Sequence, residues 1–353
     1  MFSVYVQDLL DELQQLGVGC YIGNTFLGAV AWADDFLLLA PNRAAMQQML
    51  DLAADFGLRN NLKFSCDPDP VKTKSKAIYM IGKKTRLVKP VNLQLYGKPL
   101  PWVSHATHLG HEFHEDGTMS MDARMKRGSY IGKSLEVLDS FHFAAPTEVL
   151  GAVKLFASDL YGGMLWRLDS LEAEQVGRCW NTTVKDVWGL DRATHTYIVR
   201  WLCSPHSSLR EDLLARWVKY HQSCLNSPSP EVCIVARIAA GDLRTTTGAN
   251  NRLITELGLD PRTASPAEVR LKYRESQPKE TEEQMAKLGL LLELLERRGE
   301  VYSRGEKQDR EVNDLITFLC TVYFFYTTMW AEGVLEYKPM LIILYPPNFT
   351  ELQ

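Results

Sequence analysis

Residues 26–42 read FLGAVAWADDFLLLAPN, and this stretch decides the fold of the first third of the chain. Its two apolar runs, residues 26–32 and 36–40, are separated by three residues that include Asp34 and Asp35. Short apolar runs on either side of a polar bend are typical of buried β-strands. The stretch therefore predicts a β-hairpin with two adjacent carboxylates at its bend.

Helical patterns flank this hairpin on both sides. Residues 2–16 carry apolar side chains at positions 6, 9, 10, 13 and 16, which is the spacing of one helix face. After the hairpin, Pro41 ends the second strand and Asn42 can cap a helix. The apolar positions 45, 46, 49, 50, 53 and 56 then predict a second helix, which closes at Gly57.

Strand signals continue beyond this helix. Apolar runs predict short strands at residues 61–65 and 76–81, and a further hairpin in which residues 88–95 and 102–112 flank a turn at residues 96–99. The first third is thus expected to form an antiparallel sheet with packed helices.

Helix signals replace strand signals from about residue 119 onward. Helix starts recur at Pro146, Ser170 and Ser208, and residues 281–296 carry a charged amphipathic pattern with a capping box. We therefore expect an α+β fold, in which an antiparallel sheet with packed helices is followed by an all-helical domain.

The charge of the chain is unevenly distributed. Its formal net charge is -4, but residues 72–133 contain twelve Lys and Arg against four Asp and Glu. A basic block of this kind can bind phosphate even within an acidic chain.

Seven scattered cysteines without a CxxC pair indicate a reducing compartment, and the first residues lack the pattern of a secretion signal. We therefore expect an intracellular protein, nuclear or cytoplasmic.

The adjacent carboxylates of Asp34 and Asp35 are costly to hold on a tight bend, because like charges at this distance repel each other. A divalent cation relieves the repulsion. Nucleotidyl transfer by two metal ions about 3.5–4 Å apart uses carboxylates on rigid backbone in this way. Polar turn residues without a catalytic role are the alternative interpretation of the same pair.

The bend and its neighbours resemble a known family of polymerases. Trp32-Ala33-Asp34-Asp35 resembles the aromatic-x-Asp-Asp box of reverse transcriptases, and its flanks are similar to those of non-LTR (LINE-type) retrotransposon enzymes. Further segments follow in the family's order: the helix at 42–60, the lysine-bearing stretch at 62–80, the Leu-Gly primer-grip hairpin at 108–111 and the thumb-side sequence at 159–166. The resemblance covers about residues 1–260 and is strongest up to about residue 115.

The resemblance implies the downstream half of a right-hand polymerase. It places a partial palm at residues 1–117, a helical thumb and connection at 118–265, and an unassigned, partly helical region at 266–353. The family reaction is RNA-templated addition of deoxynucleotides to a DNA primer with two Mg2+ ions, for which Asp34 and Asp35 are the implied ligands. Trp32 departs from the Tyr or Phe that is usual in this box.

Other parts of the family's active site have no counterpart in the sequence. The fingers, the template-positioning segment and the strand with the third metal-binding aspartate would lie upstream of Met1. We therefore expect a fragment that is inactive by itself, and that an upstream polymerase segment of the full-length element would complete.

Three lysines follow the second predicted helix at alternate positions. On an extended segment Lys72, Lys74 and Lys76 would point to one side, which suits contact with phosphates. The resemblance makes Lys74 the candidate to protonate the pyrophosphate leaving group. Lysines that guard a sheet edge against aggregation are the alternative.

The remaining candidates for nucleic-acid contact come from three places. Trp32 lies in the carboxylate box, and Leu109 and Gly110 lie in the primer-grip segment. The start of the helical domain contributes a basic stretch with Tyr130, and its charged members are Arg124, Lys126, Arg127 and Lys133. Basic and aromatic side chains along one helix suit sequence-independent contact with a nucleic-acid backbone. A solvated helix face is the alternative.

Two histidine patterns have the wrong spacing for a metal site. Histidines recur every third residue at positions 105, 108, 111 and 114, whereas a strand places alternate residues on one face. Cys203-x-x-His206 and His221-x-x-Cys224 resemble a zinc pair. A helix over residues 207–222 would separate these two histidines by about 22 Å, which one ion does not bridge.

The later part of the chain offers packing signals. Five tryptophans are expected to be core anchors, namely Trp166, Trp180, Trp188, Trp201 and Trp217.

Residues 315–331 are uncharged but interrupted by threonines, and they fall short of the roughly 20 residues of a membrane span. We therefore expect no membrane partner, and a membrane span at residues 315–331 is the alternative interpretation.

Two functions of other classes fit parts of the same sequence. A non-catalytic remnant of the polymerase would bind nucleic acid or a protein partner without chemistry. A helical scaffold with an accidental Asp-Asp turn is the third interpretation.

Overall fold

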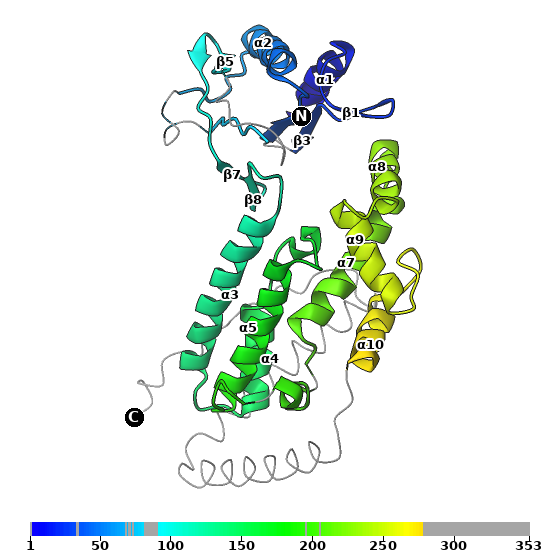
Figure 1. Cartoon of the computed structure of the whole chain (residues 1–353). Helices are drawn as coiled ribbons and strands as arrows, with labels where there is room; N and C mark the ends of the chain where they lie inside the picture. Colours follow the sequence, from blue (N-terminus) through cyan, green and yellow to red (C-terminus); the bar gives the residue numbers. More distant parts are fainter. Residues whose placement is uncertain are drawn as a thin grey trace, which may run out of the picture. The chain divides into compact units, whose positions relative to one another are not determined.

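The structure, a computed structural model, describes residues 2–32, 35–67, 69, 72, 74–80, 91–194, 196–204 and 206–277, with side chains from residue 7 onward. Within these residues the fold is mixed and mostly helical, with small two-stranded antiparallel sheets (Figure 1). The helix predicted at 281–296 and the apolar stretch 315–331 lie outside the described residues.

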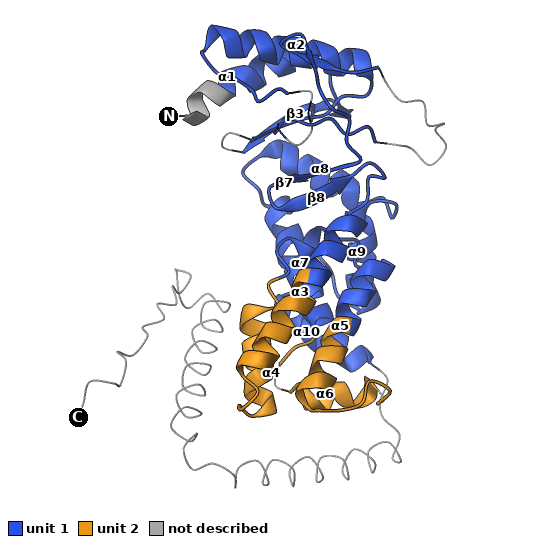
Figure 2. Cartoon of the chain, turned by 90° about the vertical axis from the view of Figure 1, so that its left-hand side faces the viewer, with its two compact units in different colours: residues 1–128, 160–178, 209–277 blue, residues 129–159, 179–208, 278–353 orange. Residues whose placement is uncertain are grey.

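The chain divides into two compact units (Figure 2). Unit 1 comprises residues 1–128, 160–178 and 209–277, and unit 2 comprises residues 129–159, 179–208 and 278–353. Each unit therefore combines segments that are distant in the sequence.

Two helices flank the first hairpins, as the apolar spacing predicted. They are α1 (Phe2–Gln15) and α2 (Arg43–Arg59). The Asn42 carboxamide accepts a hydrogen bond from the Ala45 amide at 3.0 Å, so the predicted N-cap is confirmed. The helix continues two residues past Gly57, where the sequence predicted its end.

Four separate antiparallel hairpins contain the strands of the described part. They pair β1 (Tyr21–Ile22) with β2 (Thr25–Phe26), β3 (Ala29–Trp32) with β4 (Asp35–Leu38), β5 (Gln94–Leu95) with β6 (Lys98–Pro99), and β7 (His105–His108) with β8 (His111–His114). The expected extended antiparallel sheet is not present among these residues.

The strands predicted at 61–65 and 76–81 are not formed in the described residues. Side chains rather than a strand ladder hold this segment, because the Phe64 amide donates to the Tyr96 hydroxyl at 3.3 Å and the Lys74 amide to Ser65 Oγ at 3.0 Å. A single bridge joins Ala77 to Trp102. The apolar positions that predicted strands therefore pack from irregular backbone.

Two apolar clusters hold this part of unit 1 together. Leu9 and Leu13 of α1 meet the α2 residues Met49, Ala53 and Phe56, with the first hairpins packed against them. The other side of α2 packs against the segment that contains β5, in a cluster of Leu50, Ala54, Leu93, Leu95 and Leu100. The predicted apolar faces of both helices are thus buried.

The helices after residue 119 confirm the predicted change to helical structure. Unit 1 contains the start of α3 (Ser120–Ser140), the 3-10 turn η1 (Gly163–Leu165), the first half of α5 (Leu171–Val187), α7 (Leu209–Leu225), α8 (Pro230–Ala240), α9 (Thr246–Glu256) and α10 (Pro266–Ser276). In their core, buried Asn250 accepts from the Leu168 amide at 2.8 Å and donates to the Trp166 carbonyl at 2.9 Å.

Unit 2 contains the ends of α3 and α5 together with α4 (Pro146–Phe156), the 3-10 turn η2 (Thr196–Ile198) and α6 (Val199–Leu202). Buried Tyr130 donates to Thr183 Oγ1 at 3.1 Å, and the Lys154 ammonium lies 4.6 Å from the ring centroid of Trp180.

The tryptophan predictions are mostly confirmed. Trp166, Trp180 and Trp217 are fully buried, and Trp188 is partly buried. Trp201 is 45% exposed, so its expected core role is wrong. Across the described residues, no helix is long and apolar enough to cross a membrane.

Candidate functional site

The hairpin of β3 and β4 carries Trp32 and Asp35 at its open end. The strands pair in register from Ala29 opposite Leu38 to Trp32 opposite Asp35, so two residues separate them. This confirms the predicted β-hairpin. Trp32 is 70% exposed, and Asp35 is exposed as well. Asp34, the other predicted metal ligand, lies outside the described residues.

Packing against the apolar core determines which face of this hairpin is exposed to solvent. Ala29, Phe36 and Leu38 pack against the cluster of α1 and α2, whereas Val30 is 51% exposed. Alternate residues of a strand point to opposite faces and cross-strand partners share a face. Trp32 and Asp35 therefore lie together on the outer face with Val30.

The described residues do not by themselves make a magnesium site. Asp35 is the described carboxylate of the predicted pair, and no group of three or more His, Cys, Asp or Glu within the described part could hold a metal ion. Mg2+ in proteins takes carboxylate and other oxygen ligands in octahedral geometry. A single carboxylate does not provide that, so Asp35 needs further oxygen ligands to hold the ion.

The three alternating lysines lie on irregular backbone rather than on a strand. The Lys72 ammonium is 3.9 Å from an Asp69 carboxylate oxygen, at the limit of an ion pair. Lys74 and Lys76 are exposed and make no ion pair with a described residue. They are therefore accessible cations, but the regular alternation expected of a strand is not formed.

A second hairpin turns at Leu109 and Gly110. The apolar pattern predicted one strand over residues 102–112, whereas the family resemblance placed a hairpin at 108–111. The chain reverses there, and β7 and β8 pair His108 with His111 and His105 with His114. Leu109 has φ +49° and Gly110 has φ +76°, as a two-residue turn with two positive φ angles requires. Leu109 is 41% exposed at this turn.

A buried polar cluster lies where this hairpin meets the first turns of α3. The Asp122 carboxylate, 1% exposed, accepts hydrogen bonds from Trp166 Nε1 at 2.7 Å, the Glu112 amide at 3.1 Å and Lys126 Nζ at 3.1 Å. Burial raises the pKa of Asp122, but these three donors outweigh it and hold the pKa below its ordinary value. Asp122 thus links β8, α3 and the segment around η1.

His111 completes this cluster. Its Nδ1 is 3.1 Å from the Lys126 ammonium and 3.4 Å from an Asp122 oxygen. An ammonium only donates, so the contact with Lys126 uses Nδ1 as an acceptor, whereas the contact with Asp122 uses it as a donor, and the two alternate with the tautomer of the ring.

The thumb-side sequence packs directly on the turn of the second hairpin. The Tyr161 ring stacks on His111 with centroids 5.2 Å apart, and the Lys126 ammonium is 5.4 Å from the Tyr161 centroid. A Cβ at Gly110 would lie 3.3 Å from Tyr161 Cε1. Two motifs that are about 50 residues apart in the sequence therefore form one structure.

The basic residues of α3 are largely engaged. Arg124 pairs with Glu172 at 3.1 Å, Lys126 pairs with Asp122, and the Arg127 guanidinium donates to Gln175. Lys133 is exposed and makes no ion pair with a described residue. The partners of Arg124 and Lys126 leave less net positive charge on this helix than its sequence suggests.

The remaining histidine and cysteine positions have other partners. His206 Nε2 lies 3.2 Å from the Thr147 carbonyl, and His221 Nε2 lies 3.1 Å from Asn251 Nδ2. Burial lowers the pKa of both imidazoles. His221 also stacks on Trp217, with centroids 5.5 Å apart.

The Asp122 cluster was not found from the sequence. Only the i, i+4 spacing of Asp122 and Lys126 hinted at a pair, and such pairs are common on solvated helix faces. Comparison with protein-family models and with curated proteins finds no match for this chain.

Proposed function

We propose that this chain is the palm and thumb portion of a reverse transcriptase of the non-LTR retrotransposon type, and that it binds primer–template. The observation that carries the proposal is the open end of the β3–β4 hairpin, where Trp32 and Asp35 stand side by side on the solvent-facing side. A carboxylate beside an aromatic ring on rigid strand backbone fits the end of a primer, where the ring can support a sugar or base.

The second hairpin supports the same proposal. Its turn at Leu109 and Gly110 is held by the Asp122 cluster and by the Tyr161 ring, so its backbone is fixed before any ligand binds. A hairpin held in place in this way suits contact with a nucleic-acid backbone, for which position matters more than sequence.

We expect this chain by itself to bind primer–template without extending it. Asp35 is the exposed carboxylate that the described residues contribute to the β3–β4 bend, and two metal ions need further oxygen ligands to be clamped. Displacement of a reacting atom by about 1 Å already costs about 10²-fold in rate. A non-catalytic remnant that binds nucleic acid without chemistry is the second candidate.

The test combines binding with extension. The purified chain is mixed with a labelled DNA primer annealed to an RNA template, and anisotropy is measured over a salt series. Magnesium and deoxynucleotides are then added and products are resolved on a gel. We expect binding that weakens steeply with salt and no extension.

Two results would change this proposal. Extension by the wild type that disappears in Asp34→Ala and Asp35→Asn would show that the chain is a complete enzyme. Binding that does not respond to salt would remove the nucleic-acid function. A Glu115→Gln chain is the matched control for loss of one negative charge outside the β3–β4 hairpin.

A further inference from the structure

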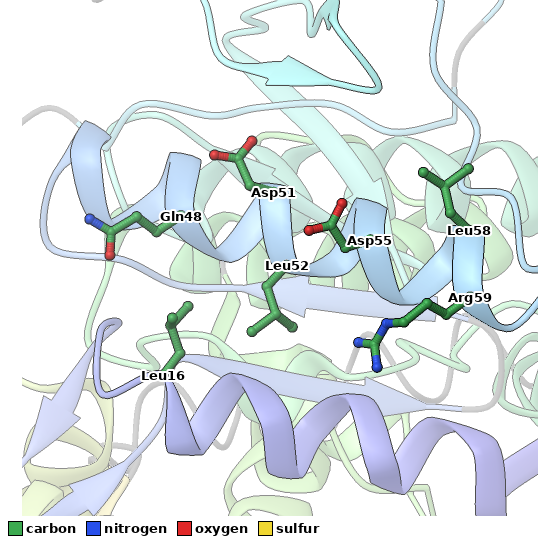
Figure 3. A pocket seen from close by; sticks show the side chains of 7 residues that line it. All are labelled: Leu16, Gln48, Asp51, Leu52, Asp55, Leu58 and Arg59. Carbon is green, nitrogen blue, oxygen red and sulfur yellow. The ribbon is translucent and has the colours of Figure 1, made fainter.

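A shallow hollow of about 650 Å³ lies between α1 and α2 (Figure 3). Leu16 and Leu52 line its apolar part, and Leu58, which is 70% exposed, stands at one end. Figure 3 shows α1 and α2 running side by side, with the Leu52 side chain directed toward α1. We call this feature the α1–α2 groove.

The rim of the α1–α2 groove is acidic. Asp51 and Asp55 stand one turn apart on α2, and Asp55 also interacts electrostatically with Arg59, one further turn along the helix. Asp51 accepts from the Gln47 carboxamide at 2.7 Å, which leaves its negative charge uncompensated. Like charges at i, i+4 destabilise a helix by a few tenths of a kcal/mol, so a cation placed between them would be favoured.

The basic residue of the groove is already engaged. Arg59 pairs with Glu12 of α1 at 2.6 Å, and this ion pair joins the two helices. Residues 1–60 contain seven Asp and Glu against two Lys and Arg. This surface therefore repels phosphates, unlike the basic block that begins at Lys72.

We propose that the α1–α2 groove binds an amphipathic helix whose polar side is rich in Lys and Arg. Leu16, Leu52 and Leu58 of the groove would contact the apolar side chains of such a helix, and Asp51 and Asp55 would pair with its cations. The inference is independent of the proposed polymerase function. A small molecule fits less well, because small-molecule sites are concave and bury most of their ligand, whereas this hollow is open to solvent.

The dimensions of the groove suit a helix. Leu58 lies six residues, or about 9 Å, further along α2 than Leu52. Leu52 is directed toward α1 and Leu58 away from it, so the two leucines border the exposed face of α2 on opposite sides (Figure 3). A docked helix repeats its apolar anchors at i, i+3, i+4 and i+7, so several anchors fit within about 9 Å. Helices lie in such grooves because ridges of side chains on one helix fit between those of the partner.

The experiment uses the full chain and a fluorescent synthetic peptide of about 18 residues, long enough for five helical turns. Leucines occupy positions i, i+3, i+4 and i+7 in repeat and lysines occupy the others. One control peptide has the same composition with scrambled leucine positions, and another has glutamate in place of lysine. We expect the amphipathic lysine peptide to bind at least tenfold more tightly than either control.

Substitutions in the α1–α2 groove test whether the peptide binds there. Asp51→Asn with Asp55→Asn should weaken binding about tenfold at low salt and less at high salt, because exposed charge pairs are screened. Leu58→Ser should also weaken it about tenfold. The matched controls are Asp8→Asn with Asp139→Asn, which remove two exposed charges elsewhere, and Leu271→Ser, an exposed leucine of α10. Circular dichroism verifies that each variant is folded.

Three outcomes would overturn the proposal. The first is equal binding of the scrambled peptide, and the second is binding that the groove variants leave unchanged. The third is a second copy as the occupant, seen in sedimentation as a wild-type dimer that Leu58→Ser dissociates. Loss of peptide binding in the groove variants with unchanged primer–template binding would support a separate protein-binding surface.

Discussion

Gly162 lies directly against the imidazole of His111, so that a methyl group at residue 162 would overlap the ring. Gly162 also has φ +67°, in the left-handed region that favours glycine. The neighbouring Tyr161 stacks on His111, so the backbone of this segment lies against the hairpin. The glycine is therefore required by packing as well as by backbone conformation.

Gly162→Ala should destabilise the fold by about 2–4 kcal/mol, the sum of a left-handed non-glycine residue and an overpacked contact. Urea unfolding followed by tryptophan fluorescence measures the change. Gly97→Ala is the matched control, since Gly97 has φ +70° and nothing within 4 Å of a new Cβ. We expect that control to cost only about 1 kcal/mol. Equal losses in the two variants would disprove the close contact with His111.

Asp122→Asn should lower the unfolding free energy by about 3 kcal/mol, because it removes the charge that balances Lys126 in a buried site. The carboxamide also presents an NH2 group toward the donors of Trp166 and Lys126. The exposed Asp8→Asn serves as the control and should change stability by less than about 0.5 kcal/mol. A loss of similar size in both chains would argue against the buried cluster.

The stabilising effect of Asp122 should disappear in acid. Its pKa in the folded chain lies below the ordinary value of 3.8, so its contribution is fully present above about pH 4 and is lost as the pH falls through the lowered pKa. The difference in unfolding free energy between wild type and Asp122→Asn should therefore be constant near neutral pH and shrink below pH 3.8. Comparing the two chains cancels the effects of other acidic groups. A difference that grows on acidification would contradict the assigned hydrogen bonds.

Lys74 and Arg124 should contribute differently to nucleic-acid binding, although both are exposed. If Lys74 neutralises a phosphate, Lys74→Ala reduces the slope of log affinity against log salt by about 0.9 on duplex DNA. Arg124→Ala should reduce it less, because the substitution also removes the pairing of Glu172 and leaves that carboxylate free to repel phosphate. Anisotropy titrations at several salt concentrations measure both slopes. A larger effect of Arg124→Ala would place the main phosphate contact on α3.

The sequence correctly predicted those helices and strands whose stabilising interactions lie within a few consecutive residues. Asn42 caps α2, Pro146 begins α4, and the two apolar runs around residues 33–35 pair as a hairpin. In each case a few consecutive residues supply the hydrogen bond, the fixed φ or the alternating burial that stabilises the element. The capping box of Ser265 and Glu268 at α10 carries the same kind of signal, although we did not predict that helix start.

Sequence patterns whose outcome depends on a distant packing partner gave wrong predictions. Residues 61–65 have the composition of a strand, but the amide of Phe64 donates to the Tyr96 hydroxyl, and within the described part of the chain no strand pairs with this segment. Strand propensity describes a side chain that suits a half-buried surface, and tertiary packing decides whether a ladder forms. The exposure of Trp201 has the same explanation, since a large apolar side chain does not specify what covers it.

The sequence by itself determined where α2, α4, α5 and α7 begin, which faces of α1 and α2 are apolar, and that two apolar runs pair as a hairpin around residues 33–35. Only the tertiary structure decided that Asp122 meets Trp166, 44 residues away, and that Arg124 meets Glu172, 48 residues away. These contacts determine which charges remain available to a ligand. They depend on the packing of segments far apart in the chain, and neither periodicity nor composition encodes which of several equivalent carboxylates a given cation will reach.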